Sequence, residues 1–318
     1  MSRSGRRIAA GLLGLAGALL AVELLLRAGG LRADTFDLGD LTSFDRAAYE
    51  AELNSLGFHD HEWTLAKEPG VQRVLVLGDS FTEGAKVDRD RLFVKVAEAS
   101  LKARVPGGVQ LFNMSRGGWD TADEVGWLRA ALSEGFDPDA VLIVFFPNDV
   151  STRSSNDTIV KEWVEEVSMR KGWLNRASVL YDWIDFARRR RAVTRRTMED
   201  YLTSIREDGK ERWAEFEAAL GEAAELCRER DLRLGLLVFP VLVQLDDEHA
   251  LEPVYAEVLA ACEELSVPAR SLLPVFAGRE AATLWCDPWD AHPNAEANAL
   301  VAPAVEDFLV ESGLVRTP

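Results

Sequence analysis

Two residues of this 318-residue chain have the types and surroundings expected of a nucleophile and its base. Ser80 stands in the sequence GDSFTEG, directly after the apolar run VLVL, where a buried strand can end and a helix can begin. A serine hydroxyl is a weak nucleophile at neutral pH, so it needs a general base and a group that orients that base. His292 in DPWDAHPN is the candidate base, and Asp290 is the candidate orienting carboxylate. Taken alone, either segment can also be an ordinary turn, because Gly, Asp, Ser and Asn are common turn residues.

Two further motifs follow predicted strands. They are FNMSRGGWDT, whose paired glycines let backbone N–H groups come close to a ligand, and FPND, which contains Asn148. In chain order the four motifs are GDSFTEG, FNMSRGGWDT, FPND and DPWDAHPN. In this order they resemble the SGNH subgroup of the GDSL hydrolases, over roughly residues 54–312. The resemblance implies a Ser80 nucleophile and a His292 base. It also implies an oxyanion hole built from the N–H groups of Ser80 and Gly118 and the side-chain amide of Asn148.

The sequence departs from this family at two positions. Most members carry an aspartate three residues before the histidine, whereas Trp289 stands there and the carboxylate is Asp290. A minority of envelope-associated relatives use the shorter Asp-x-His-Pro-Asn spacing, so the resemblance assigns the orienting role to Asp290. An arginine is usual where His59 stands, and we assign His59 no catalytic role. Gly117 is the less favoured oxyanion donor.

The remaining polar candidates are interpreted as structural. Asp79 and Asp149 are expected to bond neighbouring backbone and to shape their loops. His61 lies in an N-terminal loop, and His249 follows the acidic run DDE, where an exposed polar surface explains a histidine. No Cys and His spacing typical of a metal site is present, and no cofactor is expected.

These motifs need a scaffold that presents them at one edge. Short apolar runs predict five parallel strands, and helical apolar spacing predicts helices between and after them. The alternation predicts a three-layer α/β/α, flavodoxin-like domain with right-handed crossovers. Pro303 is expected to kink the last helix or to mark its beginning. The predicted strands are residues 73–77, 109–113, 140–145, 232–239 and 267–272, and the predicted helices are 92–103, 121–133, 213–230, 253–265 and 294–311.

The N-terminus has a different character. Arg3, Arg6 and Arg7 precede an apolar stretch over residues 8–26, which is long enough to cross a bilayer as a helix. We expect an uncleaved signal anchor with the large domain outside the cytoplasm, on the periplasmic or extracellular side. A cleaved signal peptide is the alternative.

Charge and cysteine content restrict the function classes. The chain has a net charge of −17, which argues against binding nucleic acid. The arginines at 188–191, 195 and 196 are the exception. They are interpreted as a solvated, carboxylate-paired surface or, alternatively, as a contact for lipid headgroups or an acidic glycan. Cys227 and Cys262 are expected to be packed thiols that could form a disulfide if their helices are neighbours.

The sequence thus predicts a signal anchor over residues 1–34, a lead-in segment over 35–70 and a hydrolase domain over 71–318. Residues 151–212 are expected to form a helical cap, or else a peripheral decoration. The expected activity is that of a serine esterase. It would remove acyl groups, most simply acetyl, from a small-molecule or carbohydrate ester through an acyl-serine intermediate. A glycan O-acetyltransferase and a non-catalytic glycan-binding scaffold are the alternatives, and the oligomeric state is not predicted.

Overall fold

The computed structural model describes residues 3–29, 44–151, 172–245, 249–287 and 290–317. Its contacts divide the chain into two compact units, which are described separately. The larger unit comprises Phe44–Ser155 and Glu199–Pro318, and it contains every candidate catalytic residue. The smaller unit comprises Met1–Ser43 and Asn156–Met198.

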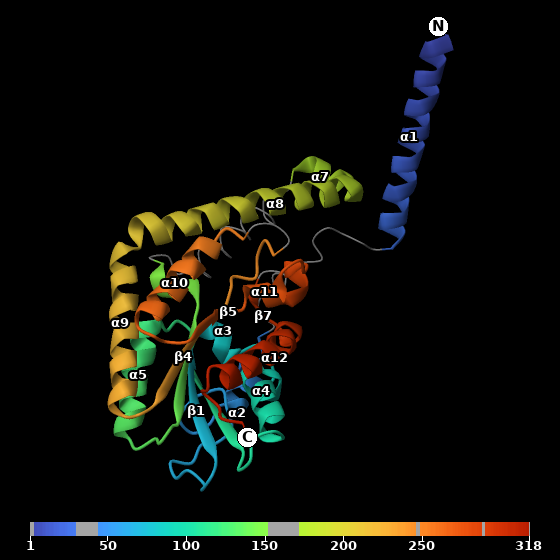
Figure 1. Ribbon diagram of the computed structural model, residues 1–318. Helices are drawn as coiled ribbons and strands as arrows, with labels where there is room; N and C mark the ends of the chain where they lie inside the picture. Colours follow the sequence, from blue (N-terminus) through green and yellow to red (C-terminus); the bar gives the residue numbers. More distant parts are fainter. Residues whose placement is uncertain (1–2, 30–43, 152–171, 246–248, 288–289, 318) are drawn as a thin grey trace. The chain divides into compact units, whose positions relative to one another are not determined.

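The larger unit is built on a five-stranded parallel sheet (Figure 1). Its strand order is β2-β1-β3-β4-β5, the flavodoxin-like order predicted from the sequence. The first four strands are buried on both faces, which explains why they read as apolar runs. The strands are β1 (Gln72–Gly78), β2 (Val109–Ser115), β3 (Ala140–Phe145), β4 (Arg233–Val238) and β5 (Ala269–Ser271).

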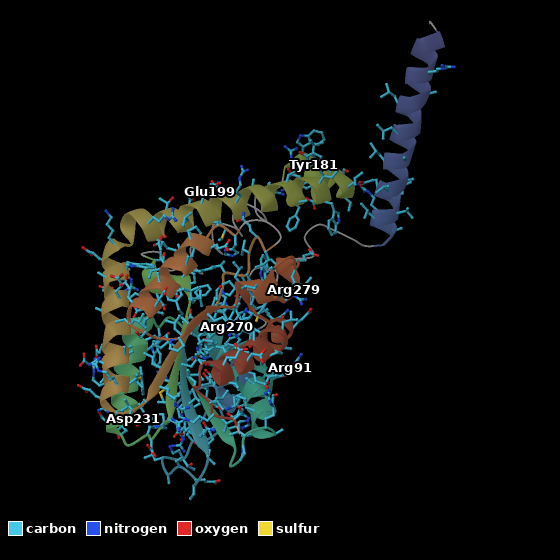
Figure 2. The ribbon with its side chains drawn as sticks, viewed as in Figure 1. Arg91, Tyr181, Glu199, Asp231, Arg270 and Arg279 are labelled. Carbon is cyan, nitrogen blue, oxygen red and sulfur yellow. The ribbon has the colours of Figure 1, made fainter. Side chains whose placement is uncertain are left out.

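Helices cover this sheet as the sequence predicted. α4 packs against α12, and α5 packs against α9, while α10 contacts the β4 and β5 edge. Side chains fill the space between the sheet and its helices (Figure 2). The helices are α4 (Phe93–Lys102), α5 (Thr121–Ser133), α9 (Lys210–Glu229), α10 (Glu252–Glu264) and α12 (Ala295–Glu311).

Several shorter elements complete the larger unit. They are α2 (Arg46–Glu52), α3 (Ser80–Glu83), the 3₁₀ turns Arg89–Arg91, Pro147–Val150 and Ala281–Leu284, α11 (Leu273–Phe276), and the strands β6 (Trp285–Asp287) and β7 (Asp290–Pro293). β6 and β7 pair antiparallel as a hairpin that the sequence analysis did not predict.

Two expectations are corrected by the fold, and a third is confirmed. The fifth strand has only three residues, Ala269–Ser271, because the predicted run is less apolar than the others. Pro303 lies inside α12 and does not mark its beginning. Cys227 and Cys262 are buried, as expected of packed thiols, and both are free.

The smaller unit holds α1 (Arg3–Ala28), α7 (Trp173–Ala177) and most of α8 (Val179–Thr203), which a π-helical turn, Ser204–Asp208, follows. α1 is long and apolar enough to cross a membrane: Ala10–Ala28 has a mean hydropathy of 1.8, and none of this stretch is buried. The lead-in residues 35–43, cap residues 152–171 and Trp289 lie outside the described residues.

Candidate active site

Ser80 lies beyond the carboxyl end of the inner strand β1, as the first residue of the short helix α3. Asp79 caps this helix, because its Oδ1 accepts a hydrogen bond from the Phe81 N–H at 2.8 Å. A Cβ at position 78 would lie 2.4 Å from the Thr82 Oγ1, so the sharp turn into the helix requires the glycine found there. β1 is flanked by β2 and β3, so Ser80 lies at the point where the strand order reverses.

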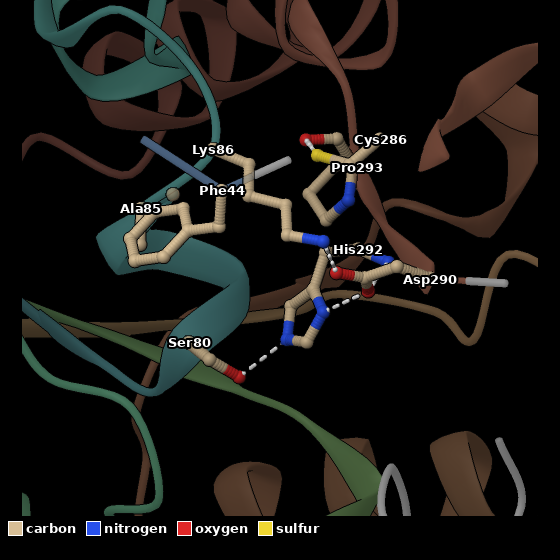
Figure 3. Close-up of a pocket in the computed structure, with 9 residues that line it drawn as sticks. Phe44, Ser80, Ala85, Lys86, Cys286, Asp290, His292 and Pro293 are labelled. Carbon is tan, nitrogen blue, oxygen red and sulfur yellow. Dashed lines mark hydrogen bonds and ion pairs between the residues drawn. The ribbon is translucent and has the colours of Figure 1, made fainter. Parts of the chain in front are cut away.

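His292 reaches Ser80 from the other end of the sequence. Its Nε2 lies 2.8 Å from the Ser80 Oγ, and its Nδ1 is hydrogen-bonded to the Asp290 Oδ1 (Figure 3). Both residues belong to β7, where side chains two positions apart point to the same side of the strand. The short Asp-x-His spacing therefore suffices to place a carboxylate beside the imidazole.

The orienting carboxylate is also held by a lysine that the sequence analysis did not identify. The Lys86 Nζ lies 2.8 Å from the Asp290 Oδ2 and 2.7 Å from the Asp287 Oδ2. Asp287 and Asp290 are cross-strand partners in the hairpin, where like charges would repel each other without a cation between them. Burial opposes ionisation of Asp290, yet the hydrogen bonds and charges of His292 and Lys86 hold the pKa of this carboxyl well below its usual value.

Three N–H groups named in the sequence analysis belong to the segments that follow β1, β2 and β3. The Ser80 N–H lies at the start of α3 and has no hydrogen-bond partner among the residues that the structure describes. Gly118 has a φ of 83°, a conformation that favours glycine, and within the described ranges its N–H has no hydrogen-bond partner. The Asn148 Nδ2 donates one hydrogen bond, to the Asp79 Oδ2 at 3.0 Å, which leaves its second hydrogen available.

Gly117 and Gly118 differ in their bonding. The Gly117 N–H donates to the Glu83 Oε2 at 2.8 Å, so this donor is already used. A Cβ on Gly117 would lie 3.6 Å from the Ser80 Cβ, which shows how close this loop comes to the serine. The other oxygen of the Glu83 carboxylate accepts a hydrogen bond from the Tyr49 hydroxyl at 2.6 Å. Glu83 thus holds the loop that contains Gly118.

Three buried carboxyl groups lie behind the site. Burial raises the pKa of Asp79 to about 6, although hydrogen bonds from Phe81 and Asn148 partly oppose this shift. Burial, together with neighbouring negative charges, raises the pKa of Asp149 and of Glu124 well above their ordinary values. Asp149 accepts a hydrogen bond from the Thr121 hydroxyl at 2.7 Å, consistent with its structural interpretation. Glu124 was not identified from the sequence, because an acidic residue in the first helical turn is common.

The other histidines lie in different settings. His59 is buried and hydrogen-bonds to the Glu83 carbonyl and to Glu52, both at 2.9 Å. His61 is partly exposed and pairs with Asp90. The interpretation of His249 as an exposed loop residue is wrong: only 5% of it is exposed, and its Nε2 bonds the Val241 carbonyl at 2.9 Å.

A pocket of about 190 Å³ opens beside Ser80 and His292 (Figure 3). Most of its wall is apolar, and the Cys286 side chain forms part of it. Burial raises the pKa of the Cys286 thiol to about 12, so the wall is uncharged at this residue. Within the part of the chain that the structure describes, no three His, Cys, Asp or Glu side chains are grouped as a metal site. The lining residues are Phe44, Ser80, Gly84, Ala85, Lys86, Cys286, Asp290, His292 and Pro293.

Comparison with known proteins identifies the family. A family model described as the GDSL-like lipase/acylhydrolase family matches residues 76–300. The chain belongs to this family. As a GDSL-like acylhydrolase it is a carboxylic ester hydrolase, and the match extends from β1 into α12, so it includes Ser80 and His292. No curated protein matches the chain at a significant level.

Solved structures with a similar fold are esterases and hydrolases of low sequence identity. A two-domain esterase active on acetylated mannans, solved with mannopentaose, is 16% identical with a TM-score of 0.45, and the match covers 78% of this chain and 51% of that one. The GDSL-like chain therefore spans about half the length of that esterase. An α/β hydrolase enzyme from the metagenome of Lake Arreo, Spain, is 17% identical with a TM-score of 0.47, covering 77% and 97%. A catalytic mutant of an acetylxylan esterase from Geobacillus stearothermophilus is 17% identical with a TM-score of 0.44, covering 78% and 97%.

Proposed function

We propose that this GDSL-like hydrolase removes small acyl groups, most simply acetyl, from a carbohydrate ester outside the cytoplasm through an acyl-serine intermediate. The observation that carries the chemistry is the contact of 2.8 Å between the Ser80 Oγ and the His292 Nε2, with Asp290 on the opposite ring nitrogen. This arrangement supplies a nucleophile, a base and a group that fixes the ring's tautomer.

The reaction begins when the Ser80 Oγ attacks the ester carbonyl carbon and its proton passes to the His292 Nε2. The carbonyl oxygen becomes an oxyanion. When the tetrahedral intermediate collapses, the bond to the alcohol oxygen breaks and His292 returns the proton to that oxygen, so a neutral alcohol leaves. Water then attacks the acyl carbon while His292 takes its proton. When this second tetrahedral intermediate collapses, the bond to the Ser80 Oγ breaks and His292 returns the proton to that oxygen, which releases the acid and free Ser80. Asp290 stays ionised throughout and stabilises the imidazolium.

The developing oxyanion is stabilised by donors that carry no net charge. We assign this role to the N–H groups of Ser80 and Gly118 and to the Asn148 amide. Gly118 suits it because its N–H is unpaired among the described residues, whereas the Gly117 N–H is bonded to Glu83. Asp79 is a positioning residue here, because it accepts a hydrogen bond from the Asn148 Nδ2. This bond fixes the amide group and leaves its other hydrogen for the oxyanion.

The substrate class is inferred from the size of the pocket and from the expected location. A pocket of about 190 Å³ is below the roughly 300–1,000 Å³ of sites that enclose a drug-sized ligand, so a short acyl or small alcohol group fits it best. Arginines at the start of α1 precede its apolar stretch and a large domain follows the helix, which favours an exported catalytic domain. A neutral carbohydrate ester suits this expected location, because the acidic body of the protein disfavours polyanions.

Active-site labelling tests this proposal directly. The detergent-solubilised full chain is treated with a fluorophosphonate, and the modified peptide is identified by mass spectrometry. We expect label on Ser80 and none in His292→Ala, while the exposed Ser133→Ala control labels like the wild type. In parallel, p-nitrophenyl acetate turnover should fall to the background rate in Ser80→Ala. Label on another serine, or equal turnover in Ser80→Ala, refutes the assignment.

A second measurement separates the hydrolase from a transferase. The enzyme is incubated with an acetylated oligosaccharide alone and then with an unacetylated acceptor oligosaccharide added. A hydrolase releases free acetate in both mixtures. Transfer of acetyl to the acceptor, without free acetate, would assign the acyl-serine to an O-acetyltransferase.

A further inference from the structure

A glutamate in the apolar helix α1 caps another helix of the smaller unit. The Glu23 carboxylate accepts hydrogen bonds from the Ser178 hydroxyl at 2.9 Å, the Val179 N–H at 2.9 Å and the Leu180 N–H at 2.8 Å. The first N–H groups of a helix lack partners within it, and they attract negative charge. Glu23 thus serves as the N-terminal cap of α8, although it lies 155 residues earlier in the sequence.

A second contact reinforces the first. Arg27, one turn further along α1, pairs with Glu23 at 2.6 Å and donates a hydrogen bond to the Ala177 carbonyl. The C-terminal end of α1 is therefore bonded to the junction between α7 and α8. Glu23 lies five residues before Ala28, the end of the apolar stretch, which is about 7 Å along a helix. The junction lies at the level where a membrane-crossing α1 would leave the hydrocarbon.

Large apolar side chains are exposed around this junction. Trp173 is 75% exposed, Ile184 is 51% exposed, and Leu174, Tyr181 and Trp183 are each about 40% exposed. Tyr181 lies on the early part of α8 (Figure 2). A cluster of this kind, with two tryptophans and a tyrosine, is unusual on a surface that faces water alone.

The acidic side chains at the start of α8 are bonded within the smaller unit. The Asn175 Nδ2 donates to the Asp182 Oδ1 at 3.1 Å and to the Asp185 Oδ2 at 2.8 Å. Asp185 also pairs with Arg189 at 2.9 Å. The start of α8 therefore holds its carboxylates in internal contacts, while its large apolar side chains are exposed.

Basic residues continue the exposed face. Arg188 and Arg195 are exposed, and they follow Tyr181 and Ile184 at spacings of three, four and seven residues, which place all four on one side of the helix. An apolar start followed by arginines on the same side is the pattern of a helix that lies at the surface of an anionic bilayer.

We propose that the surface formed by Trp173, Leu174, Tyr181, Trp183, Ile184, Arg188 and Arg195 lies in the headgroup region of an anionic phospholipid bilayer. This inference depends on the proposed membrane location of α1. Tryptophan and tyrosine favour the membrane interface, and arginine pairs with lipid phosphate. The hydrogen bonds of Glu23 hold this surface beside the end of α1. The bilayer that α1 crosses would therefore also contact this surface.

Tryptophan quenching by spin-labelled lipid tests the proposal. The full chain is reconstituted into nanodiscs of phosphatidylcholine and phosphatidylglycerol that contain a doxyl lipid labelled near the headgroup. We expect the quenched fraction of tryptophan fluorescence to fall by at least half in the double variant Trp173→Phe/Trp183→Phe. The matched control is Trp127→Phe/Trp213→Phe, which removes two tryptophans of the larger unit and should leave the absolute quenching unchanged. Glu23→Ala should also lower the quenching, because it removes the cap of α8.

The outcomes distinguish this inference from the membrane location itself. If the wild-type chain does not stay with the nanodiscs, α1 is not an anchor and the proposed location fails. If the chain is retained but Trp173→Phe/Trp183→Phe is quenched as strongly as the wild type, the lipid-facing surface is refuted while the anchor stands. Equal quenching in nanodiscs without phosphatidylglycerol would refute the role of Arg188 and Arg195.

Discussion

Removing the charge of Lys86 should change the pH dependence of the proposed esterase activity. In Lys86→Met, two facing carboxylates, Asp287 and Asp290, lose the cation between them, and the surroundings of the imidazole become more negative by one charge. More negative surroundings favour the imidazolium, which cannot accept the serine proton. The acid limb of the kcat/KM profile should therefore move to higher pH.

The expected magnitude follows from Coulomb's law. Lys86 contacts the Asp290 Oδ2 at 2.8 Å, which places its charge about 6 Å from the ring. Its side chain is 30% exposed, so an effective dielectric constant of about 40, between the buried and aqueous limits, is appropriate. The interaction is then about 1.4 kcal/mol, which corresponds to a shift of about one pH unit.

Charge complementation makes this prediction specific. Asp287→Asn leaves Lys86 in place and removes one negative charge, so its acid limb should move to lower pH by a similar amount. The double variant Lys86→Met/Asp287→Asn restores the original net charge, and its profile should return close to that of the wild type. The profiles are measured as kcat/KM for p-nitrophenyl acetate between pH 4 and 9.

A matched lysine elsewhere provides the control. Lys67 also bridges two aspartates, Asp139 at 3.0 Å and Asp137 at 3.4 Å, but it does not line the pocket. Lys67→Met should leave the acid limb in place. Superimposable profiles for Lys86→Met and the wild type, or shifts of Lys86→Met and Asp287→Asn in the same direction, would refute this electrostatic account.

Three further predictions concern the carboxyl edge of the sheet. Asn148→Ala removes a proposed oxyanion donor and should lower kcat for p-nitrophenyl acetate by about 10² to 10³, so a loss under tenfold contradicts that role. Gly118→Ala should lower the unfolding free energy by about 1–2 kcal/mol in urea titrations, because its φ of 83° strains any residue with a Cβ, and an unchanged midpoint contradicts this. The folded-state pKa of Asp79, about 6, is above its unfolded value of 3.8, so the wild type should lose up to about 3 kcal/mol of stability as pH rises through this window. The unfolding free energy of Asp79→Asn should not fall with pH in this window. Plots of unfolding free energy against pH that run parallel for the variant and the wild type would contradict this prediction.

Much of the scaffold could be predicted because its pattern is local. Strands buried on both faces must be continuously apolar, so β1 to β4 were found within one or two residues of their bounds. The length of the fifth strand was overestimated, since an edge strand needs fewer apolar residues than a central one. The β6 and β7 hairpin was missed, because its seven strand residues, WCD and DAHP, are short runs of mixed polarity that give no alternating pattern.

The candidate site was predictable where one motif contains the chemistry. Ser80, His292 and Asp290 were each named from a short segment, and the fold brings them into contact. Lys86 and Glu83 were not, because their importance comes from partners more than thirty residues away in the sequence. A lysine after GDSFTEGA looks like any exposed cation until the hairpin places two carboxylates beside it.

The separation of Ser80 from its imidazole has a consequence for biogenesis. The two residues are 212 positions apart in the sequence. A nascent polypeptide emerging from the ribosome therefore carries an inert hydroxyl until the segment that contains His292 has been synthesised and has folded against the end of β1. Chains that terminate before this segment should not hydrolyse esters in any compartment that they pass through.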